Sequence, residues 1–299
     1  MAKDFNALFK LAQEKGPKIV AVAAAQDEDV LSAIKIAYEK GIAVPILVGD
    51  KDSIERISKN IGFDLSGIMI IDEKDGSLAA RKATELVSSG TADVLMKGLI
   101  DTSVIMKQVL DSEIGLRTGN VISHVAVFDV PTYHKVFIVT DAAMIIAPDL
   151  NQKKQIIENA VELAHSLDIP HPKVAVLAAK EKVSEKMEAT VHAAKLAKMN
   201  QDGEITGCIV DGPFALDNAI SKESAKIKGI VSEVAGDADI LLAPDIEAGN
   251  VLYKALTFLA NAKSAGLIVG TKRPIVLTSR ADNEEAKLNS IVLATLMSK

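Results

Sequence analysis

Short runs of apolar and β-branched residues alternate with amphipathic stretches along almost the whole chain, and this alternation constrains the fold most. Residues 18–24 and 45–48 have the length and composition of buried strands, and a stretch with helical spacing follows each. The same order recurs at residues 94–96, 173–177 and 240–242. Strands that alternate with helices predict an α/β fold with mostly parallel sheets.

One pair of strands departs from this pattern. Residues 121–128 and 136–140 are separated by a short connection with Pro131 and Tyr133, which predicts an antiparallel hairpin. A chain of 299 residues is long enough for two domains. We expect a boundary near Ala147-Pro148-Asp149, so that residues 1–147 and a returning C-terminal helix (280–299) form the first domain. Residues 148–279 would form the second.

The composition of the chain excludes several classes of function. The net charge of −6 and the aromatic content of 3% argue against nucleic-acid binding. The single cysteine, Cys208, leaves no internal disulfide and no cysteine-cluster metal site. The histidines lack the spacing of a metal-binding pair, so we expect no metal. Without a signal peptide or an apolar run of membrane-spanning length, the sequence predicts a cytoplasmic protein with no membrane contact.

Polar side chains follow the last predicted strand, residues 275–278. They are Ser279, Arg280 and Asp282: a hydroxyl, a guanidinium and a carboxylate. Ligands of open α/β sheets bind where strands end. Because arginine suits phosphate recognition and only five of the 34 basic residues are arginines, this position indicates an anionic substrate. The alternative is a surface arginine near a turn.

Two other strand ends carry similar groups. Lys97-Gly98 precedes a predicted helix for which Thr102 or Ser103 is the expected cap, and such a helix start favours anions. The spacing matches neither a Walker A loop nor GxGxxG, so it supports neither ATP nor a dinucleotide. The segment 244–250 places two carboxylates before Gly249 and Asn250, a pattern that ordinary turn chemistry also explains.

Taken together and in order, these segments resemble the phosphate acetyl/butyryltransferase family. The resemblance is carried by Pro244-Asp245 through Gly249-Asn250 to Tyr253-Lys254, by Asp211-Gly-Pro213 with Asp217, by Asp141 with Pro148, and by Ser279-Arg280. It covers most of the chain. The short length and the Ser-Arg-Ala-Asp ending favour the phosphate butyryltransferase branch.

The resemblance implies reversible transfer of an acyl group, butyryl in that branch, between coenzyme A and inorganic phosphate, with no permanently bound cofactor. It implies two α/β/α domains with the active site in the cleft between them, similar to isocitrate and isopropylmalate dehydrogenases. It also implies a homodimer or a larger homo-oligomer. In this chemistry Arg280 would hold phosphate and stabilise the tetrahedral intermediate, with a hydrogen bond from Ser279.

The sequence leaves the identity of the general base open. Related phosphotransacetylases have a catalytic aspartate seven residues beyond the serine, where this chain has Ala286. Asp282, Glu284 and Glu285 are the candidates, and Asp282 follows the strand most closely. Further expected contacts to phosphate or coenzyme A are Lys97, Thr102, Arg117, Asp245, Asn250 and Lys254. Arg117 lies in a loop that we expect to be mobile.

Several alternative functions fit the same sequence features. A phosphate acetyltransferase, a phosphate acyltransferase that uses acyl carrier protein, or a decarboxylating dehydrogenase would share the architecture. A non-catalytic protein that binds acyl-CoA would carry the same motifs without releasing thiol.

Overall fold

The computed structural model describes residues 4–278 and 282–298. Two compact units make up the chain. The central unit contains Val121–Ser264 with Asp4 and Phe5, and the terminal unit contains Asn6–Asn120 with the described residues from Ala265 onward. The expected domains put the hairpin strands in the first domain, whereas here they belong to the central unit. Compact units are not by themselves independent domains, so the domain assignment stays a prediction.

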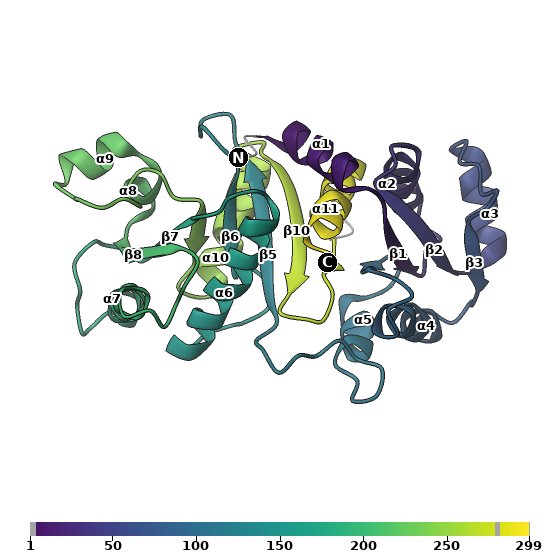
Figure 1. The fold of residues 1–299 in the computed structure, drawn as a ribbon, viewed down its shortest axis with the longest axis horizontal. Helices are drawn as coiled ribbons and strands as arrows, with labels where there is room; N and C mark the ends of the chain where they lie inside the picture. Colours follow the sequence, from purple (N-terminus) through teal and green to yellow (C-terminus); the bar gives the residue numbers. More distant parts are fainter. Residues whose placement is uncertain (1–3, 279–281, 299) are drawn as a thin grey trace. The chain divides into compact units, whose positions relative to one another are not determined.

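The terminal unit is built on parallel strands. Its strands are β1 (Lys18–Ala23), β2 (Ala43–Gly49), β3 (Met69–Asp72), β4 (Val94–Lys97) and β11 (Ile275–Val276), with β10 (Lys263–Val269) entering from the central unit. Their order is β3-β2-β1-β4-β11-β10, parallel except for β10 against β11. The helices are α1 (Phe5–Lys15), α2 (Glu28–Glu39), α3 (Lys51–Asn60), α4 (Gly76–Ser88), α5 (Thr102–Val109) and α11 (Glu284–Met297). Helix α2 packs on α11, and α4 packs on α5 (Figure 1).

The central unit has a mixed sheet. Its strands are β5 (Ser123–Asp129), β6 (Phe137–Thr140), β7 (Lys173–Leu177), β8 (Ile209–Phe214) and β9 (Ile240–Leu242), in the order β5-β6-β9-β7-β8. The predicted hairpin β5–β6 is antiparallel, and the other pairs are parallel. The helices are α6 (Leu150–Ser166), α7 (Glu188–Gln201), α8 (Leu216–Ile220), α9 (Lys222–Ile227), α10 (Ile246–Lys254) and the π-helical η1 (Ala255–Leu259). The predicted α/β class with mostly parallel strands is therefore confirmed.

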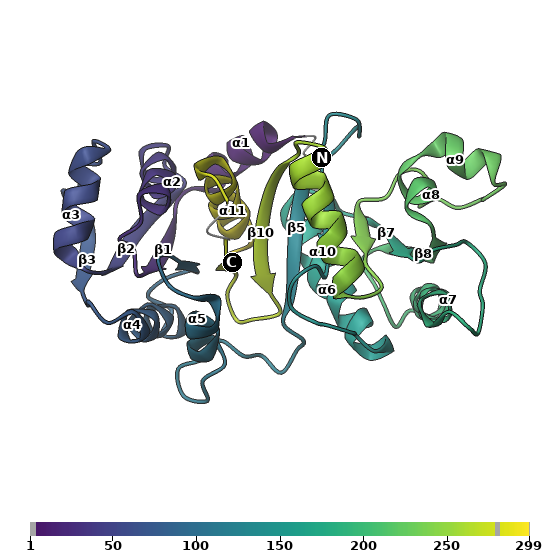
Figure 2. The same cartoon turned by 180° about the vertical axis from the view of Figure 1, so that it is seen from behind.

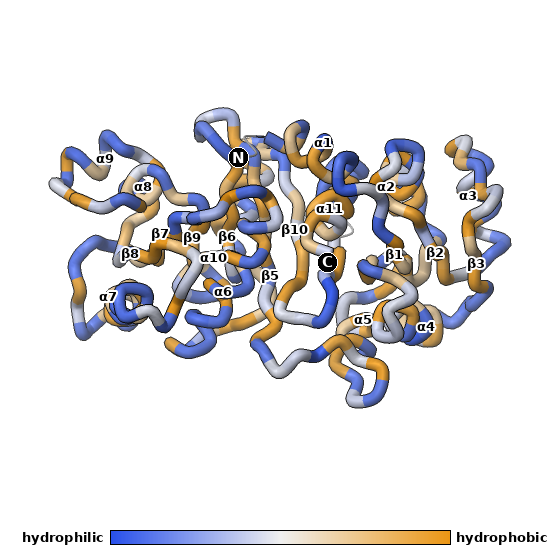
Figure 3. The backbone as a smooth tube through the Cα atoms, viewed as in Figure 1, coloured by the Kyte–Doolittle hydropathy of each residue, from blue (hydrophilic) through white to orange (hydrophobic). Residues whose placement is uncertain are grey.

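Helices cover both faces of the central sheet. Helix α6 lies in front of the sheet in Figure 1, and α10 lies in front in the reverse view of Figure 2. The core under α10 includes Phe128, Val139 and Leu241, all fully or almost fully buried. Tyr253 of α10 meets the Phe128 ring edge-on at a centroid distance of 5.3 Å. Figure 3 shows that hydrophobic residues are frequent along β6, β9 and β7, the strands that this core covers.

Candidate functional site

The carboxyl ends of β4 and β11 meet at one edge of the terminal unit. The two strands are parallel neighbours, with Val276 opposite Met96, so the chain leaves them side by side at Lys97 and Leu277. Ser279 and Arg280, the predicted catalytic residues, lie outside the described residues. Asp282 is described and partly exposed, and its backbone carbonyl accepts a hydrogen bond from the Lys287 ammonium.

The turn after β4 differs from the expected anion cradle. The N–H of Gly98 donates to Ala23 O, and that of Leu99 donates to Ala24 O, both at 2.8 Å. These two donors are therefore occupied by the end of β1. A Cβ atom on Gly98 would lie 2.2 Å from Ala24 O, which explains why only glycine fits. The buried Lys97 ammonium donates to Gly98 O and to Ile100 O at 3.3 and 3.2 Å.

The prediction that Thr102 or Ser103 caps α5 was wrong. Asp101 is the N-cap residue, without a side-chain capping bond, and Thr102 is the first helical residue and exposed. A cap precedes the first residue with helical backbone angles, and that residue is Thr102 here. The first turn of α5 is thus the part of this segment that keeps the character of an anion site.

Arg117 lies in a segment that is hydrogen-bonded to the turn after β10. It forms an antiparallel bridge with Thr271, and the Thr118 hydroxyl donates to Gly270 O at 2.8 Å. The N–H of Lys272 donates to Leu116 O at 2.8 Å. The Arg117 residue is exposed beside this bridge, and the backbone around it is hydrogen-bonded to the turn after β10.

In the central unit three helices begin at one edge of the sheet. Strands β6, β9 and β7 are adjacent and parallel, and α6, α10 and α7 follow them. Helices α6 and α10 lie on opposite faces of the sheet (Figures 1 and 2), and ligands of open α/β sheets bind at such a switch point. Asp149 caps α6 through Gln152 N at 2.8 Å, and Asp245 caps α10 through Ala248 N at 2.9 Å.

A pocket of about 440 Å³ lies beside the first turns of these helices, and we call it the β6–β9 pocket. Its lining residues come from the two strand ends and from α6 and α7: Ala147, Pro148, Asp149, Lys153, Glu188, Ala189, His192, Pro244 and Asp245. The predicted residue Asp245 is among them. The size falls in the usual range for small-molecule pockets.

Two basic groups meet inside the β6–β9 pocket. Lys153 is only 4% exposed, and its Nζ lies 3.1 Å from His192 Nδ1. Burial lowers the pKa of Lys153, against the opposing effect of Glu188, Asp245 and Asp149. Burial, and then the Lys153 charge, lowers the pKa of His192. An ammonium only donates, so His192 accepts at Nδ1 and carries its proton on Nε2, which lies 3.8 Å from Glu188 Oε1.

The Gly249-Asn250 pair fixes α10 to the end of β6. The Asn250 amide donates to Ala142 O at 3.1 Å, and a Cβ on Gly249 would lie 2.3 Å from Asp141 O. Lys254 is the last residue of α10 and is exposed, roughly 13 Å along the helix from Asp245. The structure therefore does not bring Lys254 and Asp245 together.

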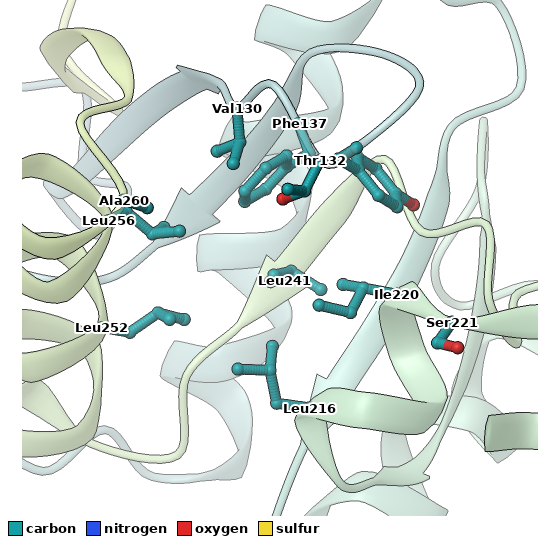
Figure 4. Close-up of a pocket in the computed structure, with 11 residues that line it drawn as sticks. Val130, Thr132, Phe137, Leu216, Ile220, Ser221, Leu241, Leu252, Leu256 and Ala260 are labelled. Carbon is teal, nitrogen blue, oxygen red and sulfur yellow. The ribbon is translucent and has the colours of Figure 1, made fainter.

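A second pocket, of about 270 Å³, lies at the opposite edge of the same sheet, near the first residue of β6, Phe137. Figure 4 shows Leu252 and Leu256 on one side of it and Leu216 and Ile220 on another. Thr132, Ser221 and Tyr133 supply its hydroxyl groups, and the Tyr133 hydroxyl donates to Ala238 O. This lining lacks charged groups, whereas the β6–β9 pocket has several.

Within residues 4–278 and 282–298, no three His, Cys, Asp or Glu side chains gather as a metal-binding group. No helix among the described residues is both long and apolar enough to cross a bilayer.

Comparison with known proteins decides the family. The model of the phosphate acetyl/butaryl transferase family matches residues 5–80 and 75–295. The chain belongs to this family. A phosphate butyryltransferase of Clostridium beijerinckii is 52% identical over 297 residues, with 99% of this chain and 98% of the relative covered. A phosphate acetyltransferase of Thermotoga maritima is 50% identical, with 97% of this chain and 98% of that relative covered.

Solved structures in the family have the same fold. A branched-chain phosphotransacylase from Enterococcus faecalis superposes with a TM-score of 0.83 at 35% identity, with 94% of this chain and 98% of that chain covered. A 4-hydroxythreonine-4-phosphate dehydrogenase from Klebsiella pneumoniae has a TM-score of 0.59 at 14% identity, with 94% of this chain and all of that chain covered. The latter likeness concerns the fold alone.

Sequence reasoning missed the Lys153–His192 pair. The two residues are 39 positions apart on different helices, and neither belongs to a motif. One signal was present: Lys153 shares the buried stripe of α6 with Ile156, Ile157 and Ala160. A lysine at such a position is buried, and buried lysines are rare unless they have a partner.

Proposed function

We propose that this protein transfers a short-chain acyl group reversibly between coenzyme A and inorganic phosphate, with butyryl as the preferred group. Membership of the family, with matches over nearly the full length, is the observation that carries the proposal. A second phosphate butyryltransferase, from Clostridium acetobutylicum, is 49% identical. The acetyltransferase of similar identity keeps acetyl as the second candidate substrate.

The chemistry is a nucleophilic substitution at the thioester carbonyl. A phosphate oxygen attacks the carbonyl carbon, a tetrahedral intermediate forms, and the C–S bond breaks to leave acyl phosphate and thiolate, which takes up a proton. We assign Arg280 to phosphate and to the developing oxyanion, and Ser279 to a hydrogen bond with sulfur or oxyanion. Preorganised donors of this kind commonly supply a large part of the rate enhancement.

The reverse reaction needs a base for the coenzyme A thiol. Ala286 occupies the position of the phosphotransacetylase aspartate and lies in the first turn of α11. Glu284 and Glu285 are exposed at the start of that helix, and Asp282 is partly exposed just before it. We keep Asp282 as first choice because it follows β11 most closely.

The remaining expectations belong to the same proposal. Lys97, Thr102, Arg117, Asp245, Asn250 and Lys254 are proposed contacts to phosphate or coenzyme A. A two-domain arrangement with an interdomain cleft like that of isocitrate dehydrogenases, a homo-oligomer, a cytoplasmic location, and coenzyme A and phosphate as substrates without a resident cofactor all stay predictions.

The test is phosphate-dependent release of free coenzyme A from acetyl-, propionyl- and butyryl-CoA, followed with a thiol reagent. Release that requires phosphate and is fastest with butyryl-CoA supports the whole proposal. Fastest release from acetyl-CoA would retain the reaction and replace the acyl group. No release from any of them would refute the proposed activity, and would favour an enzyme that uses acyl carrier protein or a binding protein.

A further inference from the structure

The β6–β9 pocket combines apolar walls with a few polar groups. Ala147, Pro148, Ala189 and Pro244 supply the walls. The polar groups are the Lys153 ammonium, the His192 ring and the carboxylates of Asp149, Glu188 and Asp245. An elongated ligand with both apolar and polar groups suits such a lining better than an inorganic ion does.

The charge of the pocket argues against a phosphate. Lys153 carries one positive charge, and three carboxylates oppose it, which leaves two net negative charges when His192 is neutral. The His192 ring accepts from the Lys153 ammonium at Nδ1, so in this arrangement it is neutral, and burial lowers its pKa in the same direction. The starts of α6, α7 and α10 favour negative charge, but Asp149 and Asp245 already cap two of these helices. A further anion would therefore meet like charges.

The same groups fit a neutral amide. An ammonium has three N–H groups, of which His192 accepts one, so a ligand carbonyl can accept another. The Asp149 and Asp245 side chains each accept one capping bond with a single oxygen, and a carboxylate has further lone pairs for a ligand N–H. Donors and acceptors in the same lining match the C=O and N–H of an amide-bearing ligand.

We propose that the β6–β9 pocket binds the pantetheine arm of coenzyme A, with Lys153 donating to an amide carbonyl and with Asp149 and Asp245 accepting from amide N–H or hydroxyl groups. This inference rests on the proposed function, which makes coenzyme A a substrate. His192 acts as a positioning residue, because its Nδ1 orients the Lys153 ammonium.

The test compares Lys153→Met with the matched control Lys154→Met. Methionine keeps much of the length and apolar volume while removing the charge. Lys154 is the next residue of α6, and its ammonium instead pairs with Glu158 at 2.6 Å. For Lys153→Met we expect the KM for butyryl-CoA to rise at least about tenfold, as for the loss of one charge-assisted hydrogen bond, with the KM for phosphate unchanged. Lys154→Met should keep both values. A rise in the phosphate KM alone, or no rise at all, would overturn the inference.

Direct binding to the wild-type protein separates this inference from the proposed function. The C2 proton of the His192 ring, identified by its loss in His192→Asn, should shift in NMR spectra when pantetheine is added. Adenosine 3′,5′-bisphosphate, the anionic part of coenzyme A, should leave it in place. A shift with the bisphosphate and none with pantetheine would overturn the inference. A pantetheine shift in a protein that releases no coenzyme A would support this pocket while refuting the proposed activity.

Discussion

Replacing Gly249 by alanine tests the close approach of α10 to the end of β6. An added Cβ would lie 2.3 Å from Asp141 O and 3.1 Å from Ala142 Cα, both backbone atoms. Relief needs a shift of about 1 Å, because ordinary carbon–oxygen contacts are about 3.4 Å. Neither neighbour is a flexible side-chain end, so the backbone itself must move. Because both neighbours are backbone atoms and the contact with Asp141 O is so short, we take the upper part of the usual cost of overpacking, about 2–3 kcal/mol.

Helix propensity acts in the opposite direction. Alanine is about 1 kcal/mol better than glycine inside a helix, so the net loss should be about 1–2 kcal/mol. For a unit of this size, 1 kcal/mol lowers Tm by about 2–4 °C, and we expect Gly249→Ala to lower it by about 2–8 °C.

Thermal unfolding followed by circular dichroism measures this loss, with Ala248→Gly as the control. Ala248 is the preceding residue of α10 and is exposed, so its change reports propensity alone and should cost about 1 kcal/mol. If propensity alone governed both sites, Gly249→Ala would raise Tm. A Tm equal to or above that of the wild type would refute the steric argument.

Four further changes have distinct outcomes. Arg280→Ala should keep the fold and lower turnover at least about 100-fold, with Arg273→Ala as the control; near-normal turnover would exclude Arg280 from catalysis. His192→Asn should flatten the pH dependence of Tm between pH 7 and 5. The pKa of His192 in the folded protein lies below the ordinary value of 6.5, so the contribution of this residue to stability is fully present above pH 6.5 and is lost as pH falls through the folded pKa. A variant whose Tm depends on pH as steeply as that of the wild type would contradict this. Cys208, whose pKa burial raises to about 11, should react with thiol reagents far more slowly at pH 8 than free coenzyme A does; rapid labelling of the native protein would disprove this. Phe128→Ala should cost about 3–5 kcal/mol in chemical denaturation, and Phe128→Leu clearly less; equal losses would show that ring volume is not what matters.

The sequence predicted those parts of the fold that depend on local pattern. The apolar runs at β1, β4 and β7 and the stripe of α6 are visible without knowledge of tertiary contacts, because burial imposes a period on each element. The antiparallel pairing of β5 and β6 followed from their short connection.

Features that depend on long-range contacts were not predictable in this way. The occupied N–H groups of Gly98 and Leu99 depend on β1, about 75 residues earlier in the chain. The Lys153–His192 contact depends on how α6 packs against α7. The family motif drew attention to Asn250 as a site residue, whereas the structure gives both Asn250 and the neighbouring Gly249 a packing role that the motif alone does not reveal.

The bridge between Arg117 and Thr271 has a consequence for protein engineering. It joins the point where the polypeptide leaves the terminal unit to the point where it returns, and the Thr118–Gly270 hydrogen bond strengthens that junction. The central unit is therefore an insertion into a host whose own ends at the insertion site are already tied together. A short turn spliced between these ends could close the host, and the excised segment could be expressed from its own gene. Such a pair of fragments would let each half be studied, labelled or exchanged between relatives separately.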